Sequence, residues 1–246
     1  RLHASARRVL SFGAALCLAV SPTLWSQALI AEVYALNALF CALCLYLALR
    51  LDATSPHAAW GGLGIALGVG LGNHLTLLWL LPALVLWLWP WGDGRRALAA
   101  LGGLAGGLLV YLYIPLAAAG DPPVNWGQAH SVQGLWWLLT GRLYHGYVWR
   151  LPLAHWPARL LAWVALWGRQ FTPVGLGLVV LGFAGGLRQR GAARRLALAL
   201  LLGIGLWSVY ALGYNTTDSY LYLLPAFLAV TPALALGAHT ALEAAW

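Results

Sequence analysis

Long runs of apolar residues dominate the chain, and short stretches rich in Arg, Asp, Gly and Pro separate them. A helix needs about 20 apolar residues to cross about 30 Å of hydrocarbon, and runs near that length recur along the sequence. We therefore predict an all-α polytopic membrane protein. Its eight predicted transmembrane helices are Val9–Trp25, Leu29–Leu49, Ala58–Gly72, Leu75–Pro90, Ala97–Leu116, Pro173–Leu187, Leu196–Leu212 and Tyr220–Leu236.

The third and fourth segments are short, so a single span over Trp60–Leu78 is the alternative. Cytoplasmic loops of membrane proteins carry an excess of Arg and Lys. Arg50 precedes the pair, and the two arginines at 95–96 follow it. Both flanks are then cytoplasmic, which requires an even number of crossings between them. The resulting hairpin places Asn73 and His74 on the outer side.

The same rule orients the rest of the chain, which we treat as one transmembrane domain over residues 1–246. A long loop, Ala117–Thr172, is predicted to lie outside, and it contains Arg142, Arg150, Arg159 and Arg169. The remaining arginines are predicted to lie inside: Arg1, Arg7, Arg8, Arg50, Arg95, Arg96, Arg188, Arg190, Arg194 and Arg195. The chain begins with Arg and has no Met, so we expect a fragment of a longer protein.

Composition supports a membrane environment. The chain has 62% hydrophobic and 8% charged residues, with a mean hydropathy of +0.77. A soluble domain carries about 25% charged residues. The net charge of +8 comes from arginines clustered between apolar runs, so it does not indicate nucleic acid. The lipid bilayer is the partner that we expect.

Glu32 interrupts the second predicted span, less than two turns from its outer end. A carboxylate within hydrocarbon costs about 2.5–3.5 kcal/mol or more, so its presence needs a reason. Three roles are open: an ion pair with an outer arginine, a ligand for a sugar or an acceptor, and a general base. Tyr34 and Asn37 follow on the same helix. Asp218 begins the last span, either as a helix N-cap or as a substrate ligand.

The outer loop is predicted to lie against the bilayer. It opens with the turn GDPPVNWG, Gly120–Gly127, whose adjacent prolines exclude a helix. Two amphipathic helices, within Ser131–Arg150 and Pro157–Gln170, are predicted to lie in the interface. Seven of the 15 Trp residues fall in this loop, and indole prefers the headgroup level.

Arg142 lies in TGRLYHG, beside Tyr144 and His145, at the level expected for lipid phosphates. A guanidinium binds phosphate oxygens in a bidentate manner, and His145 adds a donor. Arg142 binds either ordinary headgroups, a neighbouring acid, or the phosphate of a specific lipid-linked substrate. His74 and Arg169 are further candidates for the donor phosphate.

Five motifs occur in one order along the chain: WSQALIAEVYALNALF, GLGNHLT, YLYIPLAAAGDPPVNWG, LTGRLYHG and DSYLYLLPAF. Together they resemble the DUF2723 family of the glycosyltransferase 117 type, which is similar to transmembrane protein 260 and belongs to the GT-C superfamily. The resemblance covers essentially the whole chain and implies a partial GT-C-like fold.

The resemblance also implies an activity. It implies transfer of a sugar from a polyprenyl-phosphate donor to a protein or lipid acceptor at the outer membrane face, without a cofactor. The animal relative transfers mannose to protein, and a bacterial inner membrane with a periplasmic site is implied here. The residues expected to bind sugar or acceptor are Glu32, Tyr34, Asn37, Asn73, Asn125, Trp126, Tyr144, Asp218 and Tyr220.

One departure from the family pattern concerns the base. The acidic motif that resembles Asp-Ser-Gly-Glu lies in the first outer loop of family members, and no such stretch occurs in this chain. We therefore expect the catalytic base upstream and an inactive fragment, with Glu32 as the candidate base within the chain.

Two other functions remain as alternatives. A transporter or channel requires ionisable residues near the centre of its spans, and none of the predicted spans has one. A non-catalytic subunit or flippase that binds polyprenyl lipids would use the outer Arg and Trp residues equally well. The histidines of the outer loop match no zinc spacing, so no metal is predicted.

Overall fold

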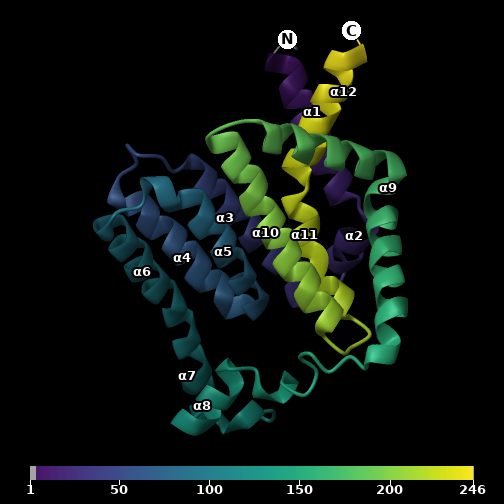
Figure 1. The fold of residues 1–246 in the computed structure, drawn as a ribbon. Helices are drawn as coiled ribbons and strands as arrows, with labels where there is room; N and C mark the ends of the chain where they lie inside the picture. The colour runs from purple at the N-terminus through teal and green to yellow at the C-terminus, as the bar shows by residue number, and fades with distance from the viewer. Residues whose placement is uncertain (1–3, 246) are drawn as a thin grey trace.

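The computed structural model describes residues 4–245, and every regular element among them is helical (Figure 1). The α-helices are α1 (Ala4–Ala19), α2 (Pro22–Ala28), α3 (Val33–Arg50), α4 (His57–Asn73), α5 (Leu81–Leu88), α6 (Gly94–Leu108), α7 (Tyr113–Ala119), α8 (Val132–Leu139), α9 (Trp156–Arg188), α10 (Ala192–Gly213), α11 (Leu224–Ala229) and α12 (Thr231–Ala245). The 3-10 segments are η1 (Leu75–Leu80), η2 (Trp89–Trp91), η3 (Leu109–Leu112), η4 (Trp126–Gln128), η5 (Arg142–Tyr144), η6 (Leu153–His155) and η7 (Ser219–Leu223).

The all-helical, apolar architecture expected from the sequence is confirmed, but the number of eight spans is not. Four segments are long and apolar enough to cross a membrane: Val33–Arg50, Gly94–Ala119, Leu153–Arg188 and Ala192–Gly213. Two bent pairs, α1 with α2 and η7–α11 with α12, raise the number to six if each pair is one span. The predicted third span is α4, which has 17 residues, and the fourth belongs to the shorter apolar stretch Leu75–Trp91.

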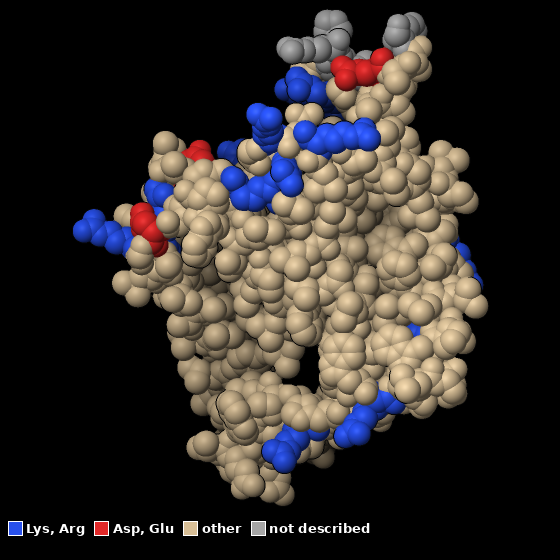
Figure 2. Space-filling view, in the orientation of Figure 1, with Lys and Arg blue, Asp and Glu red and all other residues tan. Residues whose placement is uncertain are grey.

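Charge is sorted between the two ends of the molecule. Both termini lie at one end, and the segment around α8 lies at the other (Figure 1). Most of the basic side chains visible in Figure 2 gather near the termini, and a smaller group lies at the α8 end. We call these the terminal end and the loop end. Arg1 lies outside the described residues.

Helices α4 and α6 touch backbone to backbone. A Cβ atom at Gly64 would lie 2.0 Å from the carbonyl oxygen of Ala100, and one at Gly103 would lie 2.0 Å from that of Gly61. Only glycine permits this approach, and small residues are the usual means by which helices associate closely in membranes. The glycines of the third predicted span therefore serve packing.

The structure changes the interpretation of Pro157–Gln170. This stretch is the first half of α9, which continues to Arg188 after a break at Thr172 (φ 58°, ψ 162°), just before Pro173. In Figure 1 the helix changes direction at this point. The first half lies against the bundle, because the Trp167 and Phe171 rings pack 4.8 and 6.0 Å from Phe227. It is thus part of a candidate span and not a separate interfacial helix.

The helix predicted within Ser131–Arg150 is shorter than expected. Helix α8 covers only Val132–Leu139, because Gly141 adopts a left-handed conformation (φ 61°) that ends it. Arg142 and the residues after it form η5 and irregular turns. Leu143 consequently does not continue the apolar face of α8.

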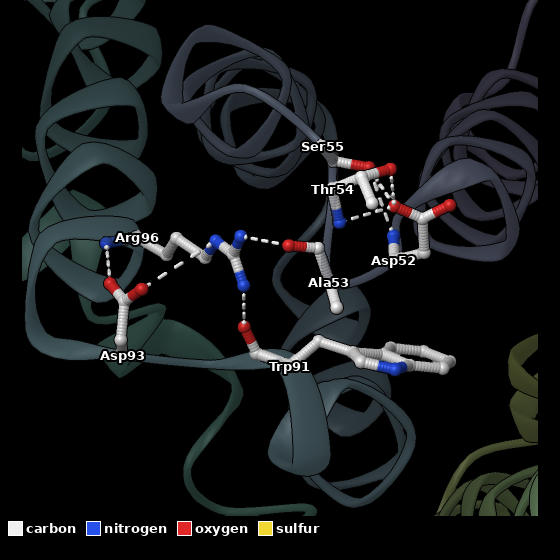
Figure 3. Close-up of polar contacts among 7 residues, drawn as sticks. All are labelled: Asp52, Ala53, Thr54, Ser55, Trp91, Asp93 and Arg96. Carbon is white, nitrogen blue, oxygen red and sulfur yellow. Dashed lines mark hydrogen bonds and ion pairs between the residues drawn. The ribbon is translucent and has the colours of Figure 1, made fainter.

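At the terminal end, Arg96 joins three segments in an arrangement that we call the Arg96 clasp (Figure 3). Its guanidinium donates to the backbone carbonyls of Ala53 and Trp91, and its Nε lies 3.7 Å from Oδ2 of Asp93. Asp93 Oδ1 accepts from the backbone N–H of Arg96 at 2.8 Å and so caps α6. That N–H lowers the pKa of the Asp93 carboxyl below its usual range.

Two further charged groups at the terminal end are also fully engaged. Asp52 accepts from Thr54 and Ser55, and the hydrogen bonds from Thr54 lower the pKa of the Asp52 carboxyl. The Arg195 guanidinium lies 5.2 and 4.7 Å from the rings of Trp87 and Trp91 and donates to the Trp87 carbonyl at 3.1 Å. Cation–π stacking and hydrogen bonding together fix this side chain.

Candidate functional site

Tyr222 is the centre of an aromatic cluster. Its ring centroid lies 6.0 Å from that of Tyr34, at the start of α3, and 5.8 Å from that of His74, between α4 and η1. It also lies 5.3 Å from Tyr210 and 5.0 Å from Tyr214, at the end of α10. We call these five residues the tyrosine cluster. Three parts of the chain that are far apart in the sequence therefore meet here.

Sequence reasoning found only part of this cluster. Tyr34 and His74 were predicted site residues, and the structure brings them together, with ring centroids 5.5 Å apart. Tyr210, Tyr214 and Tyr222 were missed. The signal available for them was the recurrence of Tyr in the stretch 210–222, on both sides of the predicted turn.

A hydrogen-bond chain behind the cluster determines which ring nitrogen of neutral His74 carries the proton. Asn37 Nδ2 donates to Thr76 Oγ1 at 3.1 Å, and Thr76 Oγ1 lies 2.7 Å from His74 Nδ1. His74 Nδ1 also accepts from the backbone N–H of Thr76 at 3.3 Å. Because Nδ1 is an acceptor, the neutral ring carries its proton on Nε2.

Burial lowers the pKa of His74 to about 4, so the ring is uncharged at neutral pH. As a candidate for the donor phosphate, His74 is therefore a neutral N–H donor and not a cation. Asn37 is 2% exposed and its side-chain oxygen has no hydrogen-bond partner among the described residues. Thr76, which the sequence analysis did not single out, links the two predicted residues.

Two carboxylates flank the cluster. Glu32 and Asp218 both interact electrostatically with Tyr34, and both residues are exposed. Burial raises the pKa of the Tyr214 phenol, and the Asp218 carboxylate raises it further. Within residues 4–245, neither acid forms an ion pair. The ion pair with an outer arginine that was one option for Glu32 is thus not formed.

The structure moves Glu32, but not Asp218, relative to the helices expected from the sequence. Glu32 is not inside a helix: its backbone N–H bonds to the Ile30 carbonyl in a tight turn, and α3 begins only at Val33. Asp218 occupies the N-cap position of η7, which is one of the two roles considered for it from the sequence. Its side chain, however, makes no capping hydrogen bond.

The side chains of Asn73 and Asn125 form hydrogen bonds that hold neighbouring segments of the backbone together. Asn73 Nδ2 donates to the Val33 carbonyl at 3.0 Å and so joins the end of α4 to the start of α3. Asn125 donates to the Ala118 carbonyl and accepts from the Ala129 N–H, and so shapes the turn after α7. Trp126 is 56% exposed. The roles predicted for these residues in sugar binding remain predictions.

The segment around η5 lies next to the cluster. A Cβ at Gly141 would lie 3.9 Å from Leu75, the residue after His74. Asn215 N–H donates to the Tyr147 carbonyl at 2.9 Å, and the Tyr147 ring lies 6.0 Å from Tyr214. Figure 2 shows an opening between this loop and the helices above it. The loop therefore borders the cluster.

Arg142 and His145 lie on this loop and both are exposed. Among the described residues, Arg142 has no hydrogen bond or ion pair, while His145 Nε2 lies 3.0 Å from the Thr140 carbonyl. Tyr144 is close enough to Tyr214 to affect its ionisation. Arg142 is thus an uncommitted cation near the cluster.

Arg169 and Tyr220 line a separate cavity of about 390 Å³, together with Arg159. Arg159 donates to the carbonyls of Tyr214 and Thr216 and to the Ser219 hydroxyl, so it holds the segment that carries Tyr222. Ten residues at 1.5 Å each place Arg169 about 15 Å further along α9. Arg169 is consequently not gathered with Arg142.

These two arginines also change one argument against a transporter. The predicted spans contained no central ionisable residue, but the candidate span Leu153–Arg188 contains Arg159 and Arg169. An ionisable residue in a membrane span indicates a functional site.

A comparison with protein families identifies one similarity. Residues 3–90 match the model of the protein O-mannosyl-transferase TMEM260 N-terminal domain. The matched part is about a third of the chain and includes Glu32, Tyr34 and His74, but not Arg142 or Asp218. The search of curated proteins and the search of solved structures found no match. The similarity supports a glycosyltransferase family for this part of the chain.

Proposed function

We propose that the chain contributes the substrate-binding end of a membrane glycosyltransferase, which transfers a sugar from a polyprenyl-phosphate donor to a protein or lipid acceptor. One observation carries the proposal: Glu32 and Asp218, two carboxylates without ion-pair partners among residues 4–245, flank an aromatic cluster near Arg142, which has no partner there either. The similarity of residues 3–90 to a protein O-mannosyl-transferase domain supports the same chemistry.

Each group has a role in such a transfer. The leaving phosphate needs cations or hydrogen-bond donors, and Arg142, with His145 beside it, supplies them. The sugar hydroxyls need acceptors, and the two carboxylates provide these. The rings of Tyr34 and Tyr222 offer an apolar wall for the sugar, and the Nε2–H of His74 is a neutral donor. Glu32 is the candidate for the catalytic base within this chain.

The direct test is sugar transfer from labelled polyprenyl-phosphate sugars in membranes that contain the full-length protein. Charge-assisted hydrogen bonds contribute about 1.5–3 kcal/mol, so Glu32→Gln and Asp218→Asn are each expected to lower kcat/KM by about 10- to 100-fold. Arg142→Ala is expected to have an effect of the same size. Arg150→Ala, on the same loop, is the control. Unchanged turnover in both Glu32→Gln and Arg142→Ala would contradict the site.

A second candidate function is a non-catalytic subunit that binds polyprenyl lipids. The cavity with Arg159 and Arg169 favours it, because that cavity lies on a candidate membrane span. The two candidates differ in one outcome: the subunit would bind the donor lipid without releasing its sugar.

A further inference from the structure

The cavity between the first half of α9, the end of α10 and η7 has mainly apolar walls. Ala162 and Leu166 line it on α9, and Ala211, Leu212 and Leu223 line it on the opposite side. Its lining residues on α9 recur at 159, 162, 163, 166 and 169, which is the spacing of one helix face. The cavity is therefore a groove along α9 with an arginine near each end.

The two arginines are not equivalent. The guanidinium of Arg159 is committed to Tyr214, Thr216 and Ser219. Arg169 is exposed and has no hydrogen bond or ion pair with any described residue. One end of the groove is thus structural, and the other presents a free cation.

No acidic residue of the chain neutralises Arg169. The sequence holds only six acids, and none of them lines the cavity. A cation on an apolar span requires a counter-charge or contact with water, because an unpaired charge in hydrocarbon is costly. A bound anion would supply the counter-charge that the chain does not provide.

The residues that line the groove indicate which kind of anion could bind there. A guanidinium binds phosphate oxygens in a bidentate manner. Since Arg159 lies about 15 Å from Arg169 along the helix, a single phosphate cannot contact both. The apolar residues between them match a hydrocarbon chain. A molecule with a phosphate at one end and a chain at the other satisfies the whole groove.

We propose that this groove binds one lipid phosphate, with the phosphate on Arg169 and the chain along Ala162 and Leu166. The site is separate from Arg142 and from the tyrosine cluster. It does not depend on the proposed transfer reaction, since it concerns binding alone.

The test is native mass spectrometry of the full chain, purified in a neutral detergent and titrated with dioleoyl phosphatidic acid. Dioleoylglycerol, which has the same chains and no phosphate, is the matched lipid. We expect one saturable phosphatidic acid molecule per protein and no retained dioleoylglycerol. Arg169→Gln is expected to weaken binding by about tenfold or more. Arg190→Gln, an exposed arginine outside the cavity, is expected to bind like the original protein.

Two further variants test the groove without changing charge. Ala162→Trp fills the cavity and is expected to abolish binding, whereas Ala165→Trp, on α9 but outside the lining, is expected to leave binding unchanged. Equal affinity in Arg169→Gln or Ala162→Trp and in the original protein would overturn the proposal. Non-saturable binding would indicate contact with bulk lipid only and would also overturn it. Displacement by inorganic phosphate would contradict the lipid as occupant.

Discussion

The two ends of the molecule use their charged residues in opposite ways. At the terminal end, Arg96, Asp93 and Asp52 are all held by hydrogen bonds, and Arg195 is stacked between two Trp rings. At the loop end, Glu32 and Asp218 make no ion pair, and Arg142 has no partner among residues 4–245.

This difference separates charges that maintain the fold from charges that are available to a ligand. A charged group held by several backbone contacts contributes to stability, and its removal leaves those groups unpaired. An exposed charge without partners contributes little to stability. Substitution of the hydrogen-bonded Arg96 should therefore change stability, and substitution of Glu32, Asp218 or Arg142 should change activity.

The largest effect on stability is expected at the Arg96 clasp. Arg96→Leu removes hydrogen bonds to Ala53 and Trp91 and the contact with Asp93, so the free energy of unfolding should fall by about 4 kcal/mol. Denaturant titration in detergent micelles measures this change. Arg95→Leu, its exposed neighbour, is the control and should change stability by less than about 0.5 kcal/mol. A similar loss in the free energy of unfolding for both variants would show that the contacts of the Arg96 clasp do not stabilise the fold.

The next largest effect is expected at Thr76, a buried polar residue in the hydrogen-bond chain behind the tyrosine cluster. Thr76→Val leaves the amide of buried Asn37 without an acceptor and removes a partner of His74. We expect a loss of about 2–3 kcal/mol in the free energy of unfolding. Exposed Thr217→Val is the control. An unchanged stability of Thr76→Val would show that the hydrogen-bond chain does not support the fold.

A smaller effect on stability is expected when the pH is lowered. Burial holds the pKa of His74 at about 4, below its ordinary value of 6.5. Between these two values the unfolded chain binds more protons than the folded one, so stability falls as the pH falls from 6.5 to 4. The expected loss is about 2 kcal/mol, after allowance for partial exposure of the ring. Thermal unfolding across this pH range measures the loss, and His74→Gln should reduce it. The same pH dependence in both proteins would contradict a buried neutral histidine.

The smallest effect on stability is expected from the acids of the loop end. Glu32→Gln and Asp218→Asn should each change the free energy of unfolding by less than about 0.5 kcal/mol, because neither side chain has a partner that would be left unpaired. Thermal unfolding of the variants used in the transfer assay checks this. A loss comparable to that of Arg96→Leu would mean that the two ends do not differ.

The helical, apolar character of the chain could be predicted because its apolar runs are long enough for helices in lipid, but the number of spans could not. The sixth predicted span begins at Pro173, next to the break at Thr172, since proline restricts the residue before it. The course of the chain before this break could not be predicted. Whether Pro157–Gln170 lies in the interface or against the bundle depends on contacts such as Trp167 with Phe227, which join residues 60 apart in the sequence.

The candidate site was predictable only where its polar residues stand out in an apolar context. Glu32, His74 and Asp218 were found in this way. Tyr222 was not, because one Tyr among several has no distinctive pattern, and its central position depends on how η7 faces α3 and α10. Arg159 and Arg169 were assigned to the outer loop because Pro157–Gln170 was predicted to lie in the interface, whereas this stretch is the first half of α9.

The direct backbone contact of α4 and α6 has a mechanical consequence. Helices separated by long side chains can slide when those side chains change rotamer, but Gly64 and Gly103 leave nothing between the two backbones that could adapt. The pair should therefore move as one rigid unit, and its backbone amides should exchange slowly with solvent.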